Sequence, residues 1–295
     1  MRSLFKNDAK KAVLLDWFDR FRARIPAQTE SHVVATRFGE THLLIGGPPD
    51  APPLVMLHGA MASSAHALVE LAPLLEHHRV YAIDVIGQSV KSADARPSVK
   101  NDEYGHWLAE VMDALSLAQA DVVGVSWGGF VSIRLAAFAP ERIRKLALLV
   151  PAGVVGGNSW AGFVKMGWPM TTYMLAPNET RLRKFVANLL TTTQDDEWVR
   201  FLGDSFLAYD VAGMSVPRLA RPEELARFTA PTLVLAADQD VSFPGEALLA
   251  RVPRLFKAPV ETELIKDCRH CPPTTPEFRA WLGGRLDSFL RAPAA

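Results

Sequence analysis

The sequence predicts an α/β fold, in which a mostly parallel sheet of about eight strands is flanked by helices. Short apolar runs alternate with helix-like segments over the first half of the 295 residues, and this alternation is typical of a parallel sheet covered on both faces. Residues 153–227 contain no convincing strand and are rich in Trp, Met, Phe and Leu. Strand-like runs then return, so we expect a helical cap inserted after about the sixth strand.

The N-terminal segment predicts an amphipathic helix over residues 7–24. Its apolar residues recur at helical spacing: Val13, Leu14, Trp17, Phe18 and Phe21. We expect this helix to pack on the edge of the domain, the alternative being a helix that lies on a membrane surface. The apolar run within it is too short for a signal peptide or a membrane span, so we expect a cytoplasmic protein without membrane insertion.

The remaining elements follow from apolar runs bounded by turn residues. Strands are expected at 32–38, 41–45, 54–57, 79–83, 121–125, 146–150, 231–236 and 260–265, and helices at 65–75, 101–117, 130–138 and 276–290. The first two strands are joined by a Gly39-Glu40 turn. Residues 1–152 and 228–295 are therefore assigned to an α/β core and 153–227 to the cap.

The charge balance argues against a nucleic-acid partner. Lys plus Arg and Asp plus Glu each number 32, for a formal net charge of zero, whereas nucleic-acid binders usually carry a basic excess. The sequence contains no pattern that predicts an oligomeric state.

One motif predicts a nucleophile. Gly124-Val125-Ser126-Trp127-Gly128 follows an apolar strand and precedes a helix, which is the context in which G-x-S-x-G presents a reactive serine. The two glycines remove side chains that would collide with such a tight turn. The helix N-terminus offers free N–H groups and a positive dipole end, which suit an oxyanion.

From residue 33 to about residue 290 the chain resembles the α/β-hydrolase fold family, in its cap-bearing group of serine hydrolases that includes carboxylesterases and lipases. The resemblance implies a base and an acid in the order serine, acid, histidine. His270 is the only histidine after Ser126, and it stands where the family usually has Gly-His, with Arg269 in place of the glycine. The family pattern of an Asp four residues before a Pro selects Asp240 over Asp238 as the acid.

The resemblance also implies an oxyanion hole formed by the backbone N–H groups of Trp127 and Ala60, with Met61 as the alternative to Ala60. His58 is expected to organise this loop. Asp84 is expected to be structural, in a segment where Ser89 replaces the second glycine of the family pattern.

The two cysteines, Cys268 and Cys271, flank His270 as C-x-x-C. They are too few for a disulfide framework, redox motifs of this spacing usually open a helix, and a structural zinc site needs four ligands. We expect them to pack, with a regulatory disulfide or a metal as alternatives. No cofactor and no metal are expected.

The predicted function is hydrolysis of a small-molecule carboxylic ester with an apolar moiety through an acyl-enzyme. Met61, Trp160, Trp168 and Phe243 are expected to line the substrate pocket. The same residues leave open a carbon–carbon bond hydrolase, a thioesterase or a perhydrolase, and also a ligand-binding receptor with little turnover. Halide and epoxide chemistry is disfavoured because it normally requires Asp in place of Ser126.

Overall fold

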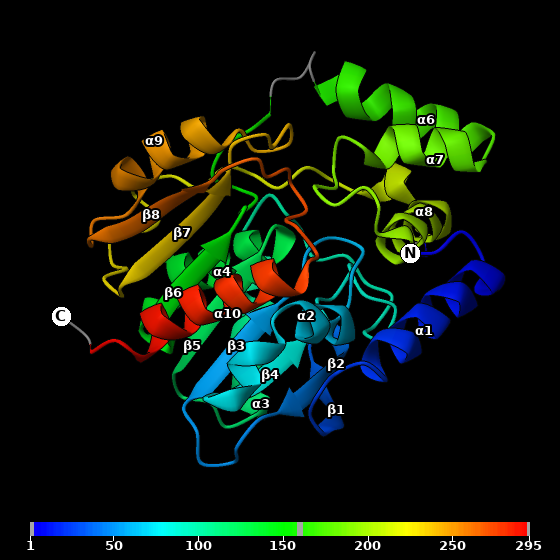
Figure 1. The fold of residues 1–295 in the computed structure, drawn as a ribbon. Helices are drawn as coiled ribbons and strands as arrows, with labels where there is room; N and C mark the ends of the chain where they lie inside the picture. Colours follow the sequence, from blue (N-terminus) through cyan, green and yellow to red (C-terminus); the bar gives the residue numbers. More distant parts are fainter. Residues whose placement is uncertain (1–2, 158–161, 294–295) are drawn as a thin grey trace.

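The computed structural model describes residues 3–157 and 162–293 (Figure 1). Within these residues one eight-stranded sheet has the order β1-β2-β4-β3-β5-β6-β7-β8. The strands are β1 (Thr29–Thr36), β2 (Gly39–Gly46), β3 (Pro53–Leu57), β4 (Arg79–Ile83), β5 (Ala120–Val125), β6 (Ile143–Leu149), β7 (Thr232–Ala237) and β8 (Val260–Ile265). β2 runs antiparallel to β1 and β4, and every other pairing is parallel. The predicted mostly parallel sheet is confirmed.

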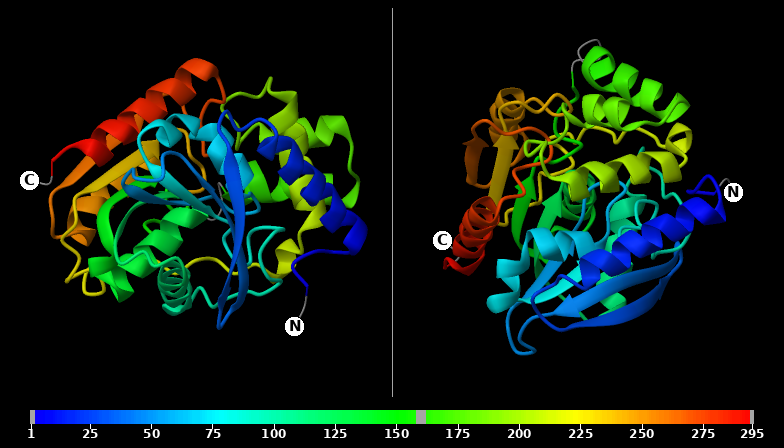
Figure 2. Two further views of the ribbon diagram at one scale, coloured as in Figure 1. Left: turned by 90° about the horizontal axis from the view of Figure 1, so that it is seen from below. Right: turned by 45° about the vertical axis from the view of Figure 1, so that its right-hand side comes forward.

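Helices cover both faces of the sheet (Figure 2). They are α1 (Asp8–Arg22), α2 (Ser64–Glu70), α3 (Glu103–Ala114), α4 (Trp127–Phe138), α6 (Trp168–Leu175), α7 (Glu179–Val186), α8 (Asp196–Ala208), α9 (Gly245–Leu255) and α10 (Pro276–Arg291). Leu54 and Met56 of β3 face the core beneath α2 and α10, whereas Val55 and Leu57 face the core beneath α3, α4 and α9. This alternation follows from the two-residue period of a strand.

The N-terminal helix predicted over 7–24 is observed as α1. Its apolar side chains Trp17 and Phe21 are buried and pack against Phe201 of α8. The Trp17 indole N–H also donates to the Asp204 carboxylate at 2.9 Å. The apolar face of α1 is therefore covered by protein. Among the residues that the structure describes, none of the helices combines the length and apolar content that crossing a bilayer requires.

Two helical segments differ from the prediction. The helix expected over 65–75 ends at Glu70 and is followed by a 3₁₀ helix, Ala72–Glu76. Pro73 explains the break, because proline has no N–H to donate and its ring clashes with the preceding turn. The helix α9 was not predicted, although Leu248, Val252 and Leu255 recur at helical spacing and are buried.

The chain between β6 and β7 is helical where it is described. A π-helical turn, Phe163–Gly167, leads into α6, and α7 and α8 follow. These helices lie beyond the carboxyl ends of β6 and β7 (Figure 1). Two isolated bridges tie the segment to the rest of the chain: Leu190 pairs with Cys271, and Tyr209 pairs with Phe5.

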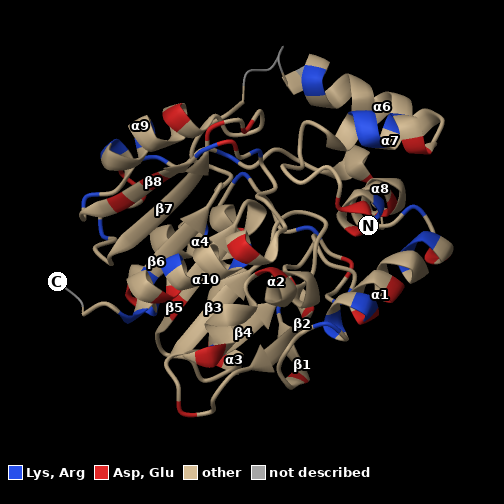
Figure 3. Ribbon diagram, in the orientation of Figure 1, with Lys and Arg blue, Asp and Glu red and all other residues tan. Residues whose placement is uncertain are grey.

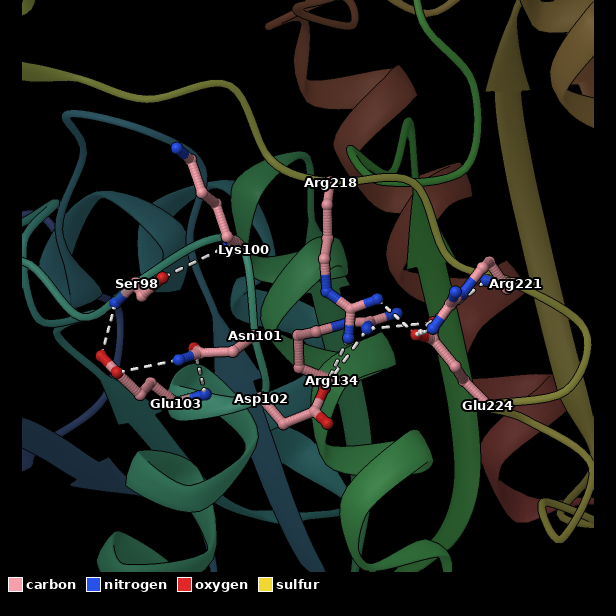
Figure 4. A network of polar contacts seen from close by, with 9 residues as sticks. All are labelled: Ser98, Lys100, Asn101, Asp102, Glu103, Arg134, Arg218, Arg221 and Glu224. Carbon is pink, nitrogen blue, oxygen red and sulfur yellow. Dashed lines mark hydrogen bonds and ion pairs between the residues drawn. The ribbon is translucent and has the colours of Figure 1, made fainter.

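A charged network fixes the return of the chain from these helices to the sheet (Figure 4). Arg134 of α4 is fully buried and donates to Asp102 at 3.3 Å and to Glu224 at 3.2 Å. Arg218 donates to both carboxylates as well, and Arg221 donates to Glu224 at 3.0 Å. The segment that precedes β7 is therefore attached to α4, the helix that begins next to Ser126.

Charges of both signs are spread over the described surface elements. Both occur on α1 and on α9, for example (Figure 3), in keeping with the formal net charge of zero.

Candidate active site

Ser126 lies on a strained turn between β5 and α4. Its φ of 50° and ψ of −108° place a non-glycine residue in a region that such residues rarely adopt. The turn brings backbone atoms so close that a Cβ on Gly124 would lie 2.6 Å from the Gly128 carbonyl oxygen. A Cβ on Gly128 would lie 2.2 Å from the Leu57 carbonyl oxygen. The two glycines of the motif are therefore required by the backbone around Ser126.

The structure brings the predicted serine, histidine and aspartate together. The Ser126 Oγ lies 2.9 Å from His270 Nε2, and His270 Nδ1 lies 2.8 Å from Asp240 Oδ2. The other oxygen of Asp240 accepts hydrogen bonds from the backbone N–H groups of Ser242 and Phe243 at 2.7 and 3.1 Å. Asp240 is thus held as an acceptor, which requires Nδ1 of His270 to carry a proton and leaves Nε2 free to accept the Ser126 hydroxyl proton.

The electrostatic setting of His270 suits a base. Burial lowers the pKa of His270, but the Asp240 carboxylate and its hydrogen bond outweigh burial, and the pKa is raised above the ordinary value of 6.5. The imidazolium that would form on accepting a proton is therefore stabilised by Asp240.

The loop that carries His270 is held from two sides. Asp238 accepts the backbone N–H groups of Cys268 at 3.0 Å and of Asp267 at 3.2 Å, and these hydrogen bonds lower the pKa of the Asp238 carboxyl. On the other side, Arg269 donates from Nη1 to the Leu190 carbonyl at 3.0 Å and from its backbone N–H to Thr191 Oγ1 at 2.9 Å. Arg269, which departs from the family glycine, thus attaches the loop to the helical segment between β6 and β7.

The loop after β3 lies against Ser126. A Cβ on Gly59 would be 3.5 Å from the Ser126 Cβ, and Ala60 and Met61 line the same cavity as Ser126. Met61 has a φ of 56°, which turns the chain there. Trp127 is the first residue of α4, a position whose N–H has no intrahelical partner. The three candidates for the oxyanion site, Trp127, Ala60 and Met61, therefore line the same cavity as Ser126.

His58 connects this loop to the end of β4. The Val85 N–H donates to His58 Nε2 at 2.9 Å, so Nδ1 carries the proton and donates to the Gly59 carbonyl at 2.7 Å. Burial lowers the pKa of His58 despite the nearby Asp84. Both ring nitrogens are used within the protein, which fits the expected organising role.

Asp84 is a buried acceptor for three segments. It accepts hydrogen bonds from His42 at 2.6 Å, from the Ser64 hydroxyl at 2.6 Å and from the Ser89 hydroxyl at 2.5 Å. Burial raises its pKa, but the His42 hydrogen bond and the other donors outweigh burial and lower it. Ser89 replaces the second glycine of the family pattern, and its hydroxyl gives that replacement a structural function.

A cavity of about 330 Å³ opens beside Ser126 and His270. Met61 and Phe243, both predicted to line a substrate pocket, line it. Trp168 is not among the lining residues; it begins α6 and is 58% exposed, whereas Met166 of the preceding π-helical turn lines the cavity. Trp160 lies outside the described residues.

Several lining residues were not predicted: His66 and Glu70 of α2, Trp198, Phe201 and Leu202 of α8, and Phe278, Arg279 and Leu282 of α10. Within each helix these residues are separated by one, three or four positions, a spacing that marks one face of a helix. The sequence spacing identifies one face of each helix, but it does not indicate that these faces meet at the cavity.

Cys268 and Cys271 are free thiols. Burial raises the pKa of each to about 12, so both are thiols rather than thiolates near neutral pH. Within the described part of the chain, no group of three or more His, Cys, Asp or Glu side chains is placed to hold a metal ion.

Comparison with known proteins places this geometry in a family. The family model described as "alpha/beta hydrolase fold" matches residues 52–201. Carboxylesterase YbfK from Bacillus subtilis (strain 168) is 35% identical over 294 residues, which cover 92% of each chain. The chain belongs to the α/β-hydrolase fold family.

Two further proteins are similar to this chain along most of their length. An uncharacterised carboxylesterase, nap, from the same organism is 29% identical over 83% of this chain and 82% of its own. Among solved structures, naproxen esterase (carboxylesterase NP) from Bacillus subtilis superposes with a TM-score of 0.80 and 25% identity, covering 96% of this chain and 98% of the other. The similarity therefore includes the helices between β6 and β7 as well as the sheet.

Proposed function

We propose that this protein hydrolyses carboxylic esters with an apolar moiety, using Ser126, His270 and Asp240 as a catalytic triad. The observation that carries the proposal is the continuous hydrogen-bonded chain from the Ser126 hydroxyl through His270 to Asp240, which borders a cavity lined largely by apolar side chains. A serine hydroxyl becomes a useful nucleophile when a base can take its proton.

In the first half of the reaction, Ser126 Oγ attacks the acyl carbon while its proton moves to His270 Nε2. The carbonyl oxygen becomes an oxyanion, which accepts hydrogen bonds from the backbone N–H groups of Trp127 and Ala60. Each donor of this kind contributes roughly 3 kcal/mol to the transition state. The proton on His270 then passes to the alkoxy oxygen, the C–O bond breaks, and the alcohol leaves an acyl group on Ser126.

In the second half, His270 takes a proton from water as the water attacks the acyl carbon. The tetrahedral intermediate collapses when His270 returns the proton to Ser126 Oγ, and the carboxylic acid departs. Asp240 remains a carboxylate throughout and holds the Nδ1–H of His270 in the required orientation. The raised pKa of His270 supports its role as the acceptor in both halves.

The helices between β6 and β7 act in this proposal as a cap of residues 153–227 on a core of residues 1–152 and 228–295. Leu189, Trp198, Phe201, Leu202 and Phe206 from this segment line the cavity. An apolar cavity favours an apolar acyl or alcohol part by removing that part from water, so substrate choice depends on the cap.

Ester hydrolysis is favoured over carbon–carbon bond cleavage by the extent of sequence similarity. The two named carboxylesterases align with 92% and 83% of the chain, whereas 2-hydroxymuconate semialdehyde hydrolase from Pseudomonas sp. (strain CF600) aligns with 35%. Haloalkane dehalogenases also align over part of the chain, but Ser126 stands where halide chemistry normally requires Asp.

The test is steady-state turnover of matched esters, thioesters and ring-cleavage diketones of graded chain length. We expect esters to have the highest kcat/KM, and Ser126→Ala to reduce it by a factor of about 10⁶. Thioesters or diketones as the better substrates would select the corresponding alternative activity. A single burst of product without turnover would select the receptor alternative.

A further inference from the structure

His66 is a buried histidine that the proposed mechanism does not use. It lies on α2, six residues after Ala60, and is 7% exposed. Its ring packs against the rings of Phe21, Trp198 and Phe201, with centroid distances of 4.9, 4.4 and 5.1 Å. It also lines the cavity that contains Ser126, so it places a polar ring among aromatic neighbours on the cavity wall.

The His66 ring has an unmet hydrogen-bonding capacity. Its Nε2 is buried and has no hydrogen-bond partner among the described residues. Leaving a buried polar atom unpaired is costly, and natural proteins seldom do so without a reason. Because the ring lines the cavity, a ligand bound there is the partner that the described residues do not supply.

The charge state of the ring limits what that partner can be. Burial, together with the positive charges of Arg279 and Arg24 and nearby His58, lowers the pKa of His66 to about 3. The ring is therefore neutral in ordinary buffers, with one nitrogen as donor and the other as acceptor. A neutral ring can donate one hydrogen bond and accept one, but it forms no ion pair with a carboxylate or an ammonium group.

The charged groups nearest to His66 on the cavity wall are paired with one another. Glu70 follows His66 by one helical turn, about 6 Å along α2. It accepts two hydrogen bonds from Arg279, at 2.9 and 2.6 Å, and one from the Trp198 indole N–H at 3.1 Å. This end of the cavity therefore carries a neutralised ion pair and suits an uncharged ligand.

We propose that His66 is a specificity-determining residue that hydrogen-bonds a hydroxyl group on the apolar part of the ester. A hydroxyl can both donate and accept, so it satisfies the imidazole in either tautomer. The inferred substrate class is an ester whose hydrocarbon acyl or alcohol chain bears a hydroxyl away from the scissile bond. The inference rests on the proposed ester hydrolysis for its site and names the part of the substrate that His66 recognises.

The test compares pairs of esters that differ only in a terminal hydroxyl in place of a methyl group. One series varies the acyl chain with a constant nitrophenol, and a second varies the alcohol with a constant acetyl group. In the wild type, the ratio of kcat/KM for the hydroxylated member to that for the plain member is expected to peak at one chain length. In His66→Phe, which keeps a ring of similar size, this ratio is expected to fall about tenfold.

Three further variants and measurements make the result decisive. Val69→Ala changes the same helix at a position that does not line the cavity, so the ratio should stay at the wild-type value. His66→Gln restores a donor and an acceptor and should recover part of the ratio. His66→Phe should also have a melting temperature equal to or above that of the wild type, because it removes an unpaired polar group. An unchanged ratio in His66→Phe across both series would overturn the proposal.

Binding separates this inference from the proposed function. Isothermal calorimetry with alkanols and the matching diols measures the same preference without turnover. If plain esters were not hydrolysed, ester hydrolysis would fail as the function. A diol preference that disappears in His66→Phe would still support recognition by His66, and equal binding of alkanols and diols would refute it.

Discussion

Glu224→Gln tests whether the charged network attached to α4 holds the chain between the helical segment and β7. Burial raises the pKa of Glu224, but hydrogen bonds from Arg218 and Arg221 and the charge of Arg134 outweigh it, and the pKa is lowered to about 2 from an ordinary value of 4.5. At about 1.4 kcal/mol for each pH unit, this difference corresponds to a stabilisation of roughly 3 kcal/mol when the carboxylate is charged. Loss of the carboxylate also leaves the buried Arg134 with less compensation.

The sign of the pH dependence follows from the lowered pKa. The stabilisation is fully present above pH 4.5 and is lost as the pH falls toward 2, because the unfolded chain then takes up the proton more readily. The free energy of unfolding in urea should be about 3 kcal/mol lower for Glu224→Gln at neutral pH. The difference in unfolding free energy between the wild type and Glu224→Gln should shrink to about 1.4 kcal/mol near pH 3. Glu223→Gln, at an exposed neighbour, should change stability by less than about 0.5 kcal/mol. A gap that stays constant with pH would refute the reasoning.

Three other substitutions test the site. Asp240→Asn should lower kcat about 10⁴-fold and move the acid limb of the pH–rate profile to lower pH, since Asp240 raises the pKa of His270; an unmoved limb would count against this coupling. Arg269→Ala should lower the free energy of unfolding by about 1.5 kcal/mol through loss of its hydrogen bond to the Leu190 carbonyl. An unchanged melting temperature in calorimetry would contradict this role. Gly128→Ala should abolish activity and reduce the soluble yield, because its Cβ would collide with the Leu57 carbonyl; wild-type turnover would contradict the tight turn.

The sequence was most informative where chemistry requires a fixed order along the chain. Ser126, Asp240 and His270 could be selected because each follows a strand, and the carboxyl ends of parallel strands meet at one edge of a sheet. Their separations of 2.9 and 2.8 Å could not be predicted, because they depend on how each loop is held. Asp238 and Arg269 hold the loop of His270 through contacts with distant residues.

Departures from a family pattern were harder to interpret from the sequence. Ser89 and Arg269 each replace a glycine, and in the sequence they read only as mismatches. In the structure, Ser89 donates to Asp84 and Arg269 donates to the Leu190 carbonyl. The partner of Arg269 lies about eighty positions away in the chain, and no local pattern indicates it.

The cavity wall was the least predictable part. Trp168 was predicted to line the pocket, yet it lies on the solvent side of α6, where 58% of the residue is exposed. His66 was overlooked because a single histidine on a short helix has no distinguishing spacing. Which face of a helix meets a cavity depends on the packing of the whole helix, which composition does not determine.

The central claim is that Ser126 is the nucleophile, and labelling with a fluorophosphonate tests it most directly. Mass spectrometry of the labelled wild-type protein should find one adduct, on the peptide that contains Ser126, and Ser126→Ala should remain unlabelled. His270→Ala should label far more slowly, since the base that activates the hydroxyl is missing. An equal rate of labelling in Ser126→Ala, or an adduct on a different serine of the wild type, would contradict the account.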